Sequence, residues 1–457
     1  MTDVLTALGP RWEGQVGGTL EAARGLAVSR RCADVAELLS VAEAGLGRCA
    51  VVSHDLRGLD LAVVARLRAS RVSVLGVHPP GDEAAERRLR ALSITVVLPV
   101  DSPPELFADA VASASRVSPT EDVEQAGASG AIVVPDDLSE ITAGSWLRTA
   151  DGGSSVDAPD APGLGSDGPR PVVGRLLAVW GPTGAPGRTT VAVTLAAEVA
   201  ARGGAVVLVD ADTYGGCVGQ ALGLLDEAPG LAAACRAADH GALDLAELAR
   251  LAPEVTSGLR VLTGIPKAER WTEIRAASLE RVLALARRLA DVVVADVGFC
   301  LENDEELSYD TVAPRRNEAT LTTLAATDLL LAVAAADPVG LQRLVRGLQE
   351  LGSVPSPVPV PVVNRVRASA VGPRPEARIS ESLLRFAGLE HVHFLPDDRE
   401  AADAAVLLGR SVVEQAPESA LRLAVGRLVD ATLPGLAGPT RPRSRWRRPR
   451  AGHGVTG

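Results

Sequence analysis

The chain has 457 residues, enough for two or three domains, and 47% of them are hydrophobic, which is sufficient to give each domain a buried core. The net charge of -11 argues against a protein that coats nucleic acid with its whole surface. The five cysteines are scattered and form no Cys-x-x-Cys pair, so they predict neither a disulfide framework nor a zinc site. The sequence shows neither a basic segment followed by an apolar leader nor an apolar run of about 18 residues. We therefore expect a cytoplasmic protein.

Residues 1–118 alternate short apolar runs with segments that carry apolar residues at helical spacing. The apolar runs lie at 4–8, 49–53, 72–77 and 94–98, with helical segments such as 34–46 and 83–92. Repeated strand and helix units predict a parallel sheet that is covered by helices on both faces. We therefore expect an α/β fold for this first domain.

This pattern resembles the response-regulator receiver domain, which has a flavodoxin-like fold, because Asp55 follows the strand where receivers carry their phosphorylated aspartate. Receivers also hold a metal with acidic residues after the first strand, and here that place reads Gly9-Pro10-Arg11. Residues 98–101 lack the lysine that receivers carry near their fifth strand. Without these groups Asp55 cannot stabilise the charge of an incoming phosphoryl group. The first domain is therefore predicted to be a pseudo-receiver that binds a partner or positions the second domain.

The composition changes at residues 119–172, which are rich in Ser, Gly, Pro, Asp and Ala. Such a segment buries too little apolar surface to offset its chain entropy, so it is predicted to be a flexible acidic linker. Residues 436–457 are predicted to be a basic disordered tail, since the arginines concentrate between Arg441 and Arg450. A weak contact of this tail with an anionic membrane, at its inner face, or with DNA is a hypothesis that follows from its charge.

The second domain, predicted at 173–435, begins with an apolar run at 176–180, a loop of glycines and prolines, and a helical segment. Glycine lets a loop turn its N–H groups inward, and the following helix adds free N–H groups and the positive end of its dipole. This arrangement predicts an anion cradle for a nucleotide phosphate. The loop departs from the P-loop pattern G-x-x-x-x-G-K-[ST], because Pro182 replaces the first glycine and Arg188 replaces the lysine.

Further apolar runs predict more parallel strands in the second domain, at 205–212, 291–296, 329–334 and 360–365. Three of these runs end in polar residues, which are Asp210, Asp212, Asp296 and Asn364. In open parallel sheets the ligand lies beyond the carboxyl ends of the strands. We therefore expect these side chains at the same edge as the phosphate loop, in a doubly wound sheet.

The order of these motifs resembles the ParA/MinD family of P-loop ATPases, of the SIMIBI type, over most of the second domain. The resemblance implies ATP and Mg²⁺ as cofactors, with Thr189, Asp210 and Asp296 at the metal. It implies catalytic roles for Arg188 and for Asp212, which would orient the attacking water, whereas Asn364 would read the adenine edge. The residues that it implies for nucleotide binding are Gly184, Ala185, Pro186, Gly187, Arg188, Thr189, Thr190, Asn364, Arg365, Pro396 and Asp397.

A receiver-like domain before such an ATPase resembles the arrangement of CpaE and TadZ proteins, which help to place Tad/Flp pilus machinery. Septum-site-determining relatives share the altered loop. The resemblance implies that the chain organises an envelope assembly in space, through protein partners of a pilus, secretion or division apparatus and through a homodimer. It implies no small-molecule substrate besides the nucleotide.

Two lysines of the family are replaced in this loop. One of them, which reaches across an ATP-sandwiched dimer, falls on Thr183, and the other falls on Arg188. Losing a charge-assisted bond of about 1.5–3 kcal/mol weakens phosphate binding by roughly ten- to a hundredfold. Hydrolysis depends still more on donors that are already in place, so the sequence favours ATP binding with weak or absent hydrolysis.

Two other functions stay open from the sequence. The three glycines of the loop, together with Asp210, also resemble the dinucleotide-binding fingerprint of an oxidoreductase. The Tyr-x-x-x-Lys of short-chain dehydrogenases is missing, because Lys267 is the only lysine and has no such tyrosine. A nucleotide-free scaffold is the second alternative, since both domains have lost charged catalytic positions, although the acids at the strand ends argue against it.

Overall fold

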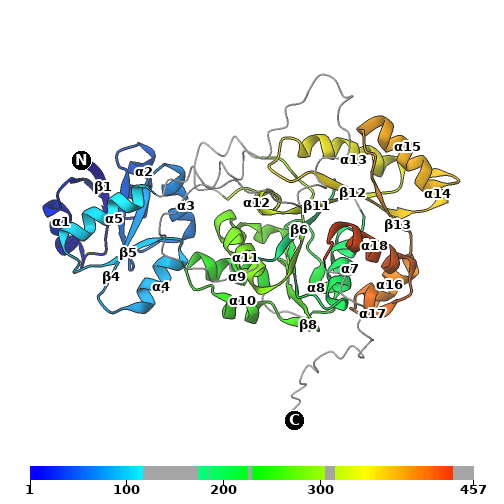
Figure 1. Ribbon diagram of the computed structural model, residues 1–457, viewed down its shortest axis with the longest axis horizontal. Helices are drawn as coiled ribbons and strands as arrows, with labels where there is room; N and C mark the ends of the chain where they lie inside the picture. The colour runs from blue at the N-terminus through cyan, green and yellow to red at the C-terminus, as the bar shows by residue number, and fades with distance from the viewer. Residues whose placement is uncertain (117–172, 185, 225–228, 304–313, 436–457) are drawn as a thin grey trace, which may run out of the picture. The chain divides into compact units, whose positions relative to one another are not determined.

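The first sheet has five strands, all of them parallel. The computed structural model describes residues 1–116, 173–184, 186–224, 229–303 and 314–435. The strands of the first sheet are β1 (Thr2–Ala7), β2 (Leu26–Arg31), β3 (Cys49–Ser53), β4 (Ser73–His78) and β5 (Val96–Pro99). They lie in the order β2-β1-β3-β4-β5, which is the doubly wound order of flavodoxin-like folds (Figure 1).

Helices cover both faces of this sheet. They are α1 (Glu13–Ala22), α2 (Val35–Glu43), α3 (Leu61–Ala69), α4 (Glu83–Ala91) and α5 (Pro104–Arg116). Val4 and Val51 belong to one buried cluster with Phe107 of α5, whereas Leu5 and Val52 belong to another. Successive strand residues therefore point to opposite faces and both faces are buried, as the sequence predicted for a parallel sheet.

The second sheet has eight strands in the order β13-β12-β11-β6-β10-β7-β9-β8. They are β6 (Arg175–Trp180), β7 (Val206–Ala211), β8 (Glu254–Thr256), β9 (Leu259–Leu262), β10 (Val292–Val297), β11 (Leu329–Ala335), β12 (Pro359–Val366) and β13 (His393–Pro396). Only β8 is antiparallel to its neighbour. Strand β6 lies between β11 and β10, so the loop that follows it is flanked by the carboxyl ends of both strands.

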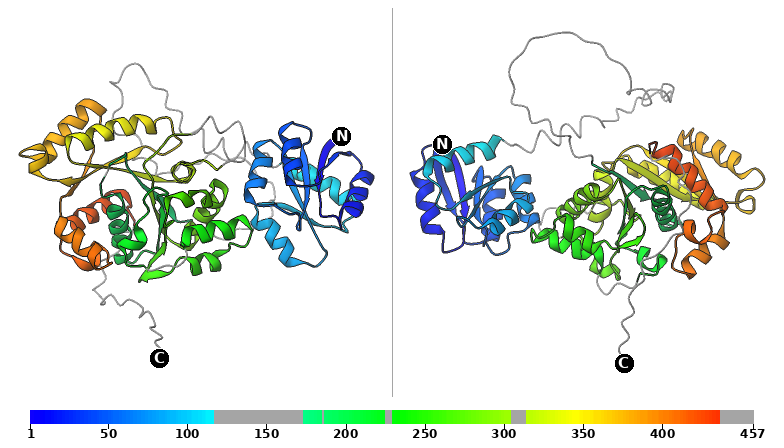
Figure 2. Two further views of the ribbon diagram at one scale, coloured as in Figure 1. Left: turned by 180° about the vertical axis from the view of Figure 1, so that it is seen from behind. Right: turned by 60° about the horizontal axis from the view of Figure 1, so that its bottom comes forward.

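Two helical layers cover the second sheet. The longer helices are α7 (Arg188–Ala201), α9 (Gly230–Asp239), α10 (Leu245–Leu251), α11 (Ala276–Leu289), α12 (Glu318–Ala326), α13 (Pro338–Leu351), α15 (Pro375–Ala387), α16 (Arg399–Leu407) and α18 (Ala420–Thr432). The short ones are α8 (Val218–Ala221), α14 (Ala368–Val371), α17 (Val412–Gln415) and the 3₁₀ helix η1 (Ala268–Glu273). Helix α18 packs beside α7, as Figure 2 shows in red and dark green.

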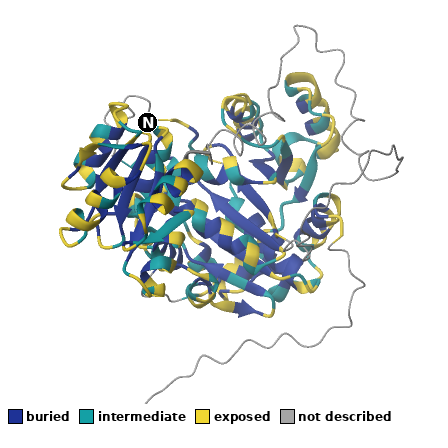
Figure 3. Cartoon of the chain, turned by 60° about the vertical axis from the view of Figure 1, so that its left-hand side comes forward, coloured by how far each residue is buried: buried dark blue, intermediate teal, exposed yellow. Residues whose placement is uncertain are grey.

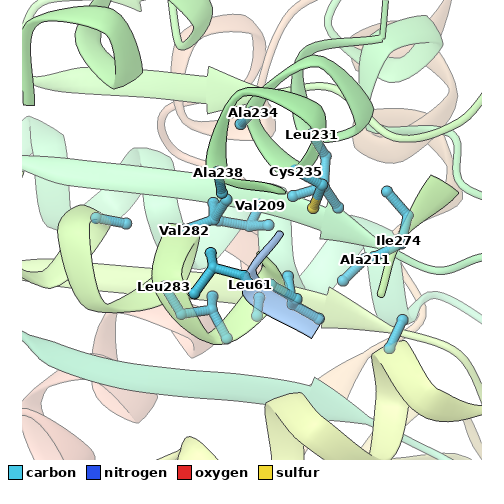
Figure 4. Close-up of a cluster of buried hydrophobic side chains, with 14 of the residues drawn as sticks. Leu61, Val209, Ala211, Leu231, Ala234, Cys235, Ala238, Ile274, Val282 and Leu283 are labelled. Atoms are coloured by element: carbon cyan, nitrogen blue, oxygen red, sulfur yellow. The ribbon is translucent and has the colours of Figure 1, made fainter. Parts of the chain in front are cut away.

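Strand β6 illustrates how the two layers share the sheet. Ala178 and Trp180 belong to the buried cluster that includes α9, α11 and α13, whereas Leu177 and Val179 belong to the cluster of α7 and α18. Figure 3 shows the strands as the most buried part of the chain. Figure 4 shows one part of this packing, where Cys235 of α9 lies near strand residues of β7. The predicted α/β class is therefore confirmed.

Some elements differ from the prediction. Strand β3 has the predicted bounds, but β2 was not predicted, because Leu26 is its only buried residue and its apolar run covers only residues 26–28. The short pair β8 and β9 was also missed. The predicted linker and tail lie outside the described residues. Among the described helices, none is long and apolar enough to cross a membrane.

Candidate phosphate-binding site

The loop between β6 and α7 leaves the first N–H groups of the helix open. Gly184 and Gly187 have φ of +69° and +95°, a region that favours glycine, and Gly187 is the N-cap residue of α7. No side chain caps this helix, and the first turn of a helix has no intrahelical partners for its N–H groups. The predicted cradle therefore has the backbone geometry that binds anions. Ala185 lies outside the described residues.

Two buried aspartates lie side by side next to this loop. Asp210 of β7 and Asp296 of β10 are register partners in neighbouring parallel strands, and both are almost fully buried. Thr189, in the first turn of α7, donates its hydroxyl to Asp296 Oδ2 at 2.5 Å. Asp210 Oδ2 accepts from the Val218 N–H at 3.0 Å. The structure thus brings together the three residues predicted for the metal.

The remaining oxygens of these carboxylates lack partners. Oδ1 of Asp210 and Oδ1 of Asp296 are buried and accept no hydrogen bond from the described residues. Burial raises the pKa of Asp296 to about 7, although the hydroxyl of Thr189 lowers it. Burial also raises the pKa of Asp210, and the neighbouring charge of Asp296 raises it further. Both shifts mean that the folded chain holds acidic groups whose ionised forms are poorly solvated.

The residues present fit a magnesium ion that is bound together with phosphates. Mg²⁺ prefers oxygen ligands, and it usually keeps several waters and shares substrate phosphates with one or two carboxylates. Thr189 and the free oxygens of Asp210 and Asp296 supply hard oxygen donors of this kind. Within the described parts of the chain, no group of three or more acidic, His or Cys side chains could hold a metal by itself. A bound ion would therefore need oxygens from a ligand.

Arg188 turns away from the helix and toward two acceptors. It donates to the Gly181 carbonyl oxygen at 3.1 Å and to Asp212 Oδ2 at 3.3 Å. The other carboxylate oxygen of Asp212 accepts the N–H groups of Tyr214 and Gly215, at 2.9 and 3.2 Å. Every oxygen of the Asp212 carboxylate therefore has a partner within the protein. The Arg188 contact therefore competes with any water molecule that Asp212 would orient.

The residues predicted for the nucleoside gather at the ends of β12 and β13. Asn364 Nδ2 donates to the Pro186 carbonyl oxygen at 3.2 Å, and its Oδ1 accepts from the Arg365 N–H at 2.9 Å. Pro396 pairs with the last residue of β12, and Asp397 follows it in the chain. The structure therefore ties the Asn364 amide to the loop backbone, and it places Pro396 and Asp397 beside the end of β12. Their contact with adenine stays a prediction.

The sequence interpretation missed one arginine beside the loop. Arg343 of α13 donates to the Thr183 carbonyl oxygen at 3.3 Å. This contact joins residues 160 positions apart, so no local motif signals it. Arg316 lies over the ring of Tyr214, with its guanidinium carbon 3.7 Å from the centroid, and donates to the Thr213 hydroxyl at 2.9 Å.

Comparisons with known proteins give structural neighbours only. No family model matches the sequence, and no curated protein matches it. One similar structure is a ParA family ATPase from Chlorobium tepidum TLS, with 18% identity, 56% of this chain and 97% of that chain covered, and a TM-score of 0.47.

Two further neighbours were solved with nucleotides. The septum site-determining protein MinD from Pyrococcus horikoshii OT3, complexed with Mg-ADP, has 17% identity over 58% of this chain and 98% of that chain, with a TM-score of 0.45. A variant of McdA from Cyanothece, in complex with ATP, has 17% identity over 56% of this chain and 96% of that chain, with a TM-score of 0.43. The structural neighbours of this chain are ParA/MinD family ATPases.

Proposed function

We propose that the chain binds ATP with Mg²⁺ at the loop between β6 and α7. The observation that carries this proposal is the pair of buried carboxylates, Asp210 and Asp296, each with an unpartnered oxygen beside the Thr189 hydroxyl. A buried polar oxygen without a partner costs about 1–3 kcal/mol, so a ligand that satisfies it recovers that free energy. The open first turn of α7 lies beside them and suits a phosphate.

Weak or absent hydrolysis is the second part of the proposal. Hydrolysis requires a polar group that can position the attacking water, and Asp212 is the residue implied for this role. Its pairing with Arg188 and with two backbone N–H groups supports a state in which this carboxylate is not available. Arg188 would have to leave both Asp212 and the Gly181 carbonyl oxygen to reach a phosphate.

The biological role that we propose is spatial organisation of an envelope assembly, such as a Tad/Flp pilus machine or the division site. The CpaE/TadZ-like layout supports it, with a pseudo-receiver at 1–118, an acidic linker at 119–172, a nucleotide-binding domain at 173–435 and a basic tail at 436–457. Partner proteins, a homodimer and a contact of Arg441 to Arg450 with an anionic membrane or DNA belong to this proposal. Deletion of residues 440–457 should reduce sedimentation with anionic vesicles or retention on DNA.

A nucleotide-free scaffold is the second candidate, and the Arg188 pairing with Asp212 is the observation that favours it. In this arrangement the charges of Arg188 and Asp212, the two residues implied for catalysis, neutralise each other. The oxidoreductase alternative has less support. Its ribose-binding acid would be Asp210, which is buried and engaged with the Val218 N–H. The buried carboxylates with free oxygens favour nucleotide binding over both alternatives.

Calorimetric titration of the full chain with Mg-ATP tests the proposal. Thr189→Ala should weaken binding by roughly tenfold or more, whereas Thr189→Ser keeps the hydroxyl and should bind like the wild type. Removing Mg²⁺ with EDTA should have an effect similar to that of Thr189→Ala. No heat and no thermal shift at millimolar nucleotide would contradict ATP binding and leave the scaffold.

Phosphate release from the same samples tests the proposed lack of hydrolysis. At saturating Mg-ATP we expect the wild type to release phosphate no faster than Asp212→Asn. Release that is clearly faster in the wild type would show that Asp212 does orient water, and this second part of the proposal would then be wrong.

A further inference from the structure

Helix α13 packs closely against the start of the phosphate loop. A Cβ atom on Gly347 would lie 2.8 Å from the Trp180 ring and 3.2 Å from Pro182, so only a residue without a side chain permits this approach. Arg343 lies one turn earlier on α13. Its side chain therefore starts next to the loop, although the residue is 160 positions away from Thr183 in the sequence.

The guanidinium of Arg343 and the loop are fitted to each other. Nη1 of Arg343 donates to the Thr183 carbonyl oxygen at 3.3 Å. A Cβ atom on Gly184 would lie only 2.0 Å from the same nitrogen, so the glycine at this place leaves room for the arginine as well as for the positive φ. One hydrogen bond uses one of the five N–H donors of the group. The others remain for a further acceptor.

The charges around the loop leave Arg343 as a cation that a ligand could use. Arg188 is already paired with Asp212, and Asp210 and Asp296 add further acidic groups. Among the residues that the structure describes, no carboxylate lies within ion-pair distance of Arg343. A polyphosphate that enters this site needs positive charge besides the metal.

A cavity of about 1050 Å³ borders Arg343 and the start of the loop. Thr183, Arg343 and Arg346 lie along its wall. The wall also carries carboxylates, among them Glu318 and Glu350. Arg346 lines the same cavity from the same helix, but none of the described hydrogen bonds joins it to the loop. It is therefore a matched control for Arg343.

We propose that Arg343 is a phosphate-binding residue, which supplies a cation to the phosphates of ATP from within the same chain. The inference rests on the proposed function, because it needs a nucleotide at the loop. Guanidinium groups bind phosphate oxygens with two parallel N–H bonds, so Arg343 contacts the phosphates through N–H groups that the Thr183 carbonyl does not use. Because the charge comes from the same chain, its contribution does not depend on protein concentration.

The test is calorimetric titration of the full chain with Mg-ATP and Mg-ADP, for the wild type and the variants Arg343→Ala, Arg343→Gln, Arg343→Lys and Arg346→Ala. Glutamine keeps a donor for the Thr183 carbonyl but removes the charge. We expect Arg343→Ala and Arg343→Gln to weaken Mg-ATP binding by roughly ten- to a hundredfold, with a smaller loss for Mg-ADP, which carries less charge. Arg343→Lys should retain most of the affinity, and Arg346→Ala should stay within about twofold of the wild type.

The outcomes separate this inference from the function on which it rests. Arg343→Gln that binds Mg-ATP like the wild type would mean that the arginine only holds the loop, and the inference would be wrong while ATP binding stands. Equal losses for Arg343→Ala and Arg346→Ala would also overturn it, because they indicate a general effect of charge. A wild type that does not bind nucleotide would overturn the proposed function itself. Thermal unfolding without nucleotide verifies that each variant is folded.

Discussion

Both sheets carry acidic side chains at the carboxyl ends of parallel strands, but these carboxylates have different surroundings. In the first sheet Asp55 follows β3 and is exposed. One of its oxygens accepts from the Ser53 hydroxyl at 2.7 Å, and the other accepts from the Trp12 indole N–H at 3.2 Å. Ser53 in turn accepts from the Gly9 N–H at 2.7 Å. Asp55 therefore closes a local network around the end of β1.

In the second sheet the carboxylates are buried and only partly satisfied. Asp210 accepts the Val218 N–H, Asp296 accepts the Thr189 hydroxyl, and each carboxylate leaves one oxygen without a partner among the described residues. Such an oxygen destabilises the chain by about 1–3 kcal/mol unless a ligand satisfies it. An acidic residue at a strand end therefore indicates a ligand site only when its hydrogen bonds have been counted. By this criterion Asp55 is a structural residue, whereas Asp210 and Asp296 each keep an oxygen that a ligand could satisfy.

The largest expected difference between the two regions is in nucleotide affinity. Asp296→Asn should weaken Mg-ATP binding by roughly a hundredfold, because it removes a charged acceptor beside Thr189. Asp55→Asn should leave the affinity within about twofold of the wild type. Calorimetric titration of the two variants side by side measures both effects. A comparable loss in both would remove the distinction between the regions.

Stability without ligand should change in opposite directions. Asp210→Asn is expected to raise the free energy of unfolding by about 1–3 kcal/mol, since the raised pKa of Asp210 means that the folded chain must either bury a poorly solvated charge or take up a proton, and an amide needs neither. Asp55→Ala is expected to lower it by about 1–2 kcal/mol, since it removes the partners of Ser53 and Trp12. Chemical denaturation in the absence of nucleotide and Mg²⁺ measures both changes. Destabilisation by Asp210→Asn would indicate that the carboxylate is needed for folding.

A methyl group added beside each carboxylate gives a smaller, matched comparison. The Cβ of Gly264→Ala would lie 2.6 Å from the Asp210 carboxyl carbon, and that of Gly9→Ala would lie 2.5 Å from Asp55 Oδ1. Asp210 is enclosed and cannot move, so Gly264→Ala should destabilise the chain by about 1–3 kcal/mol. Asp55 is exposed and can rotate away with the loss of its bonds to Ser53 and Trp12, so Gly9→Ala should cost no more than Asp55→Ala, about 1–2 kcal/mol. A larger shift of the denaturation midpoint for Gly9→Ala than for Gly264→Ala would contradict this reasoning.

The smallest expected effect is the response of Asp55 to a phosphate donor. Because both of its oxygens are already bonded and the first strand is followed by no acidic residue, incubation with acetyl phosphate and Mg²⁺ should leave the chain unmodified. Intact mass measurement, with Asp55→Asn as the baseline, is sensitive to a single phosphoryl adduct. An adduct that is absent from Asp55→Asn would show that the first sheet belongs to an active receiver.

The amino-acid sequence was sufficient to predict the fold class and the sheet edge at which the candidate residues lie. Apolar runs such as that of β3 specify buried strands, because a parallel sheet covered on both faces needs apolar residues at successive positions. The glycines at 184 and 187 and the acids at 210 and 296 could also be identified from the sequence. Glycine conformation and the polarity of strand ends are local properties, and local properties can be read from neighbouring residues.

Which of these groups already have hydrogen-bond or ion-pair partners follows from the tertiary structure alone. Edge strand β2 escaped prediction because its position is set by pairing with β1 rather than by an apolar run. The pairing of Arg188 with Asp212 and the approach of Arg343 to Thr183 depend on how helices pack over the sheet. The fold decides which residues meet, and Arg343 and Thr183 are 160 positions apart in the chain. The number of free donors and acceptors at the site is therefore a property of the folded chain.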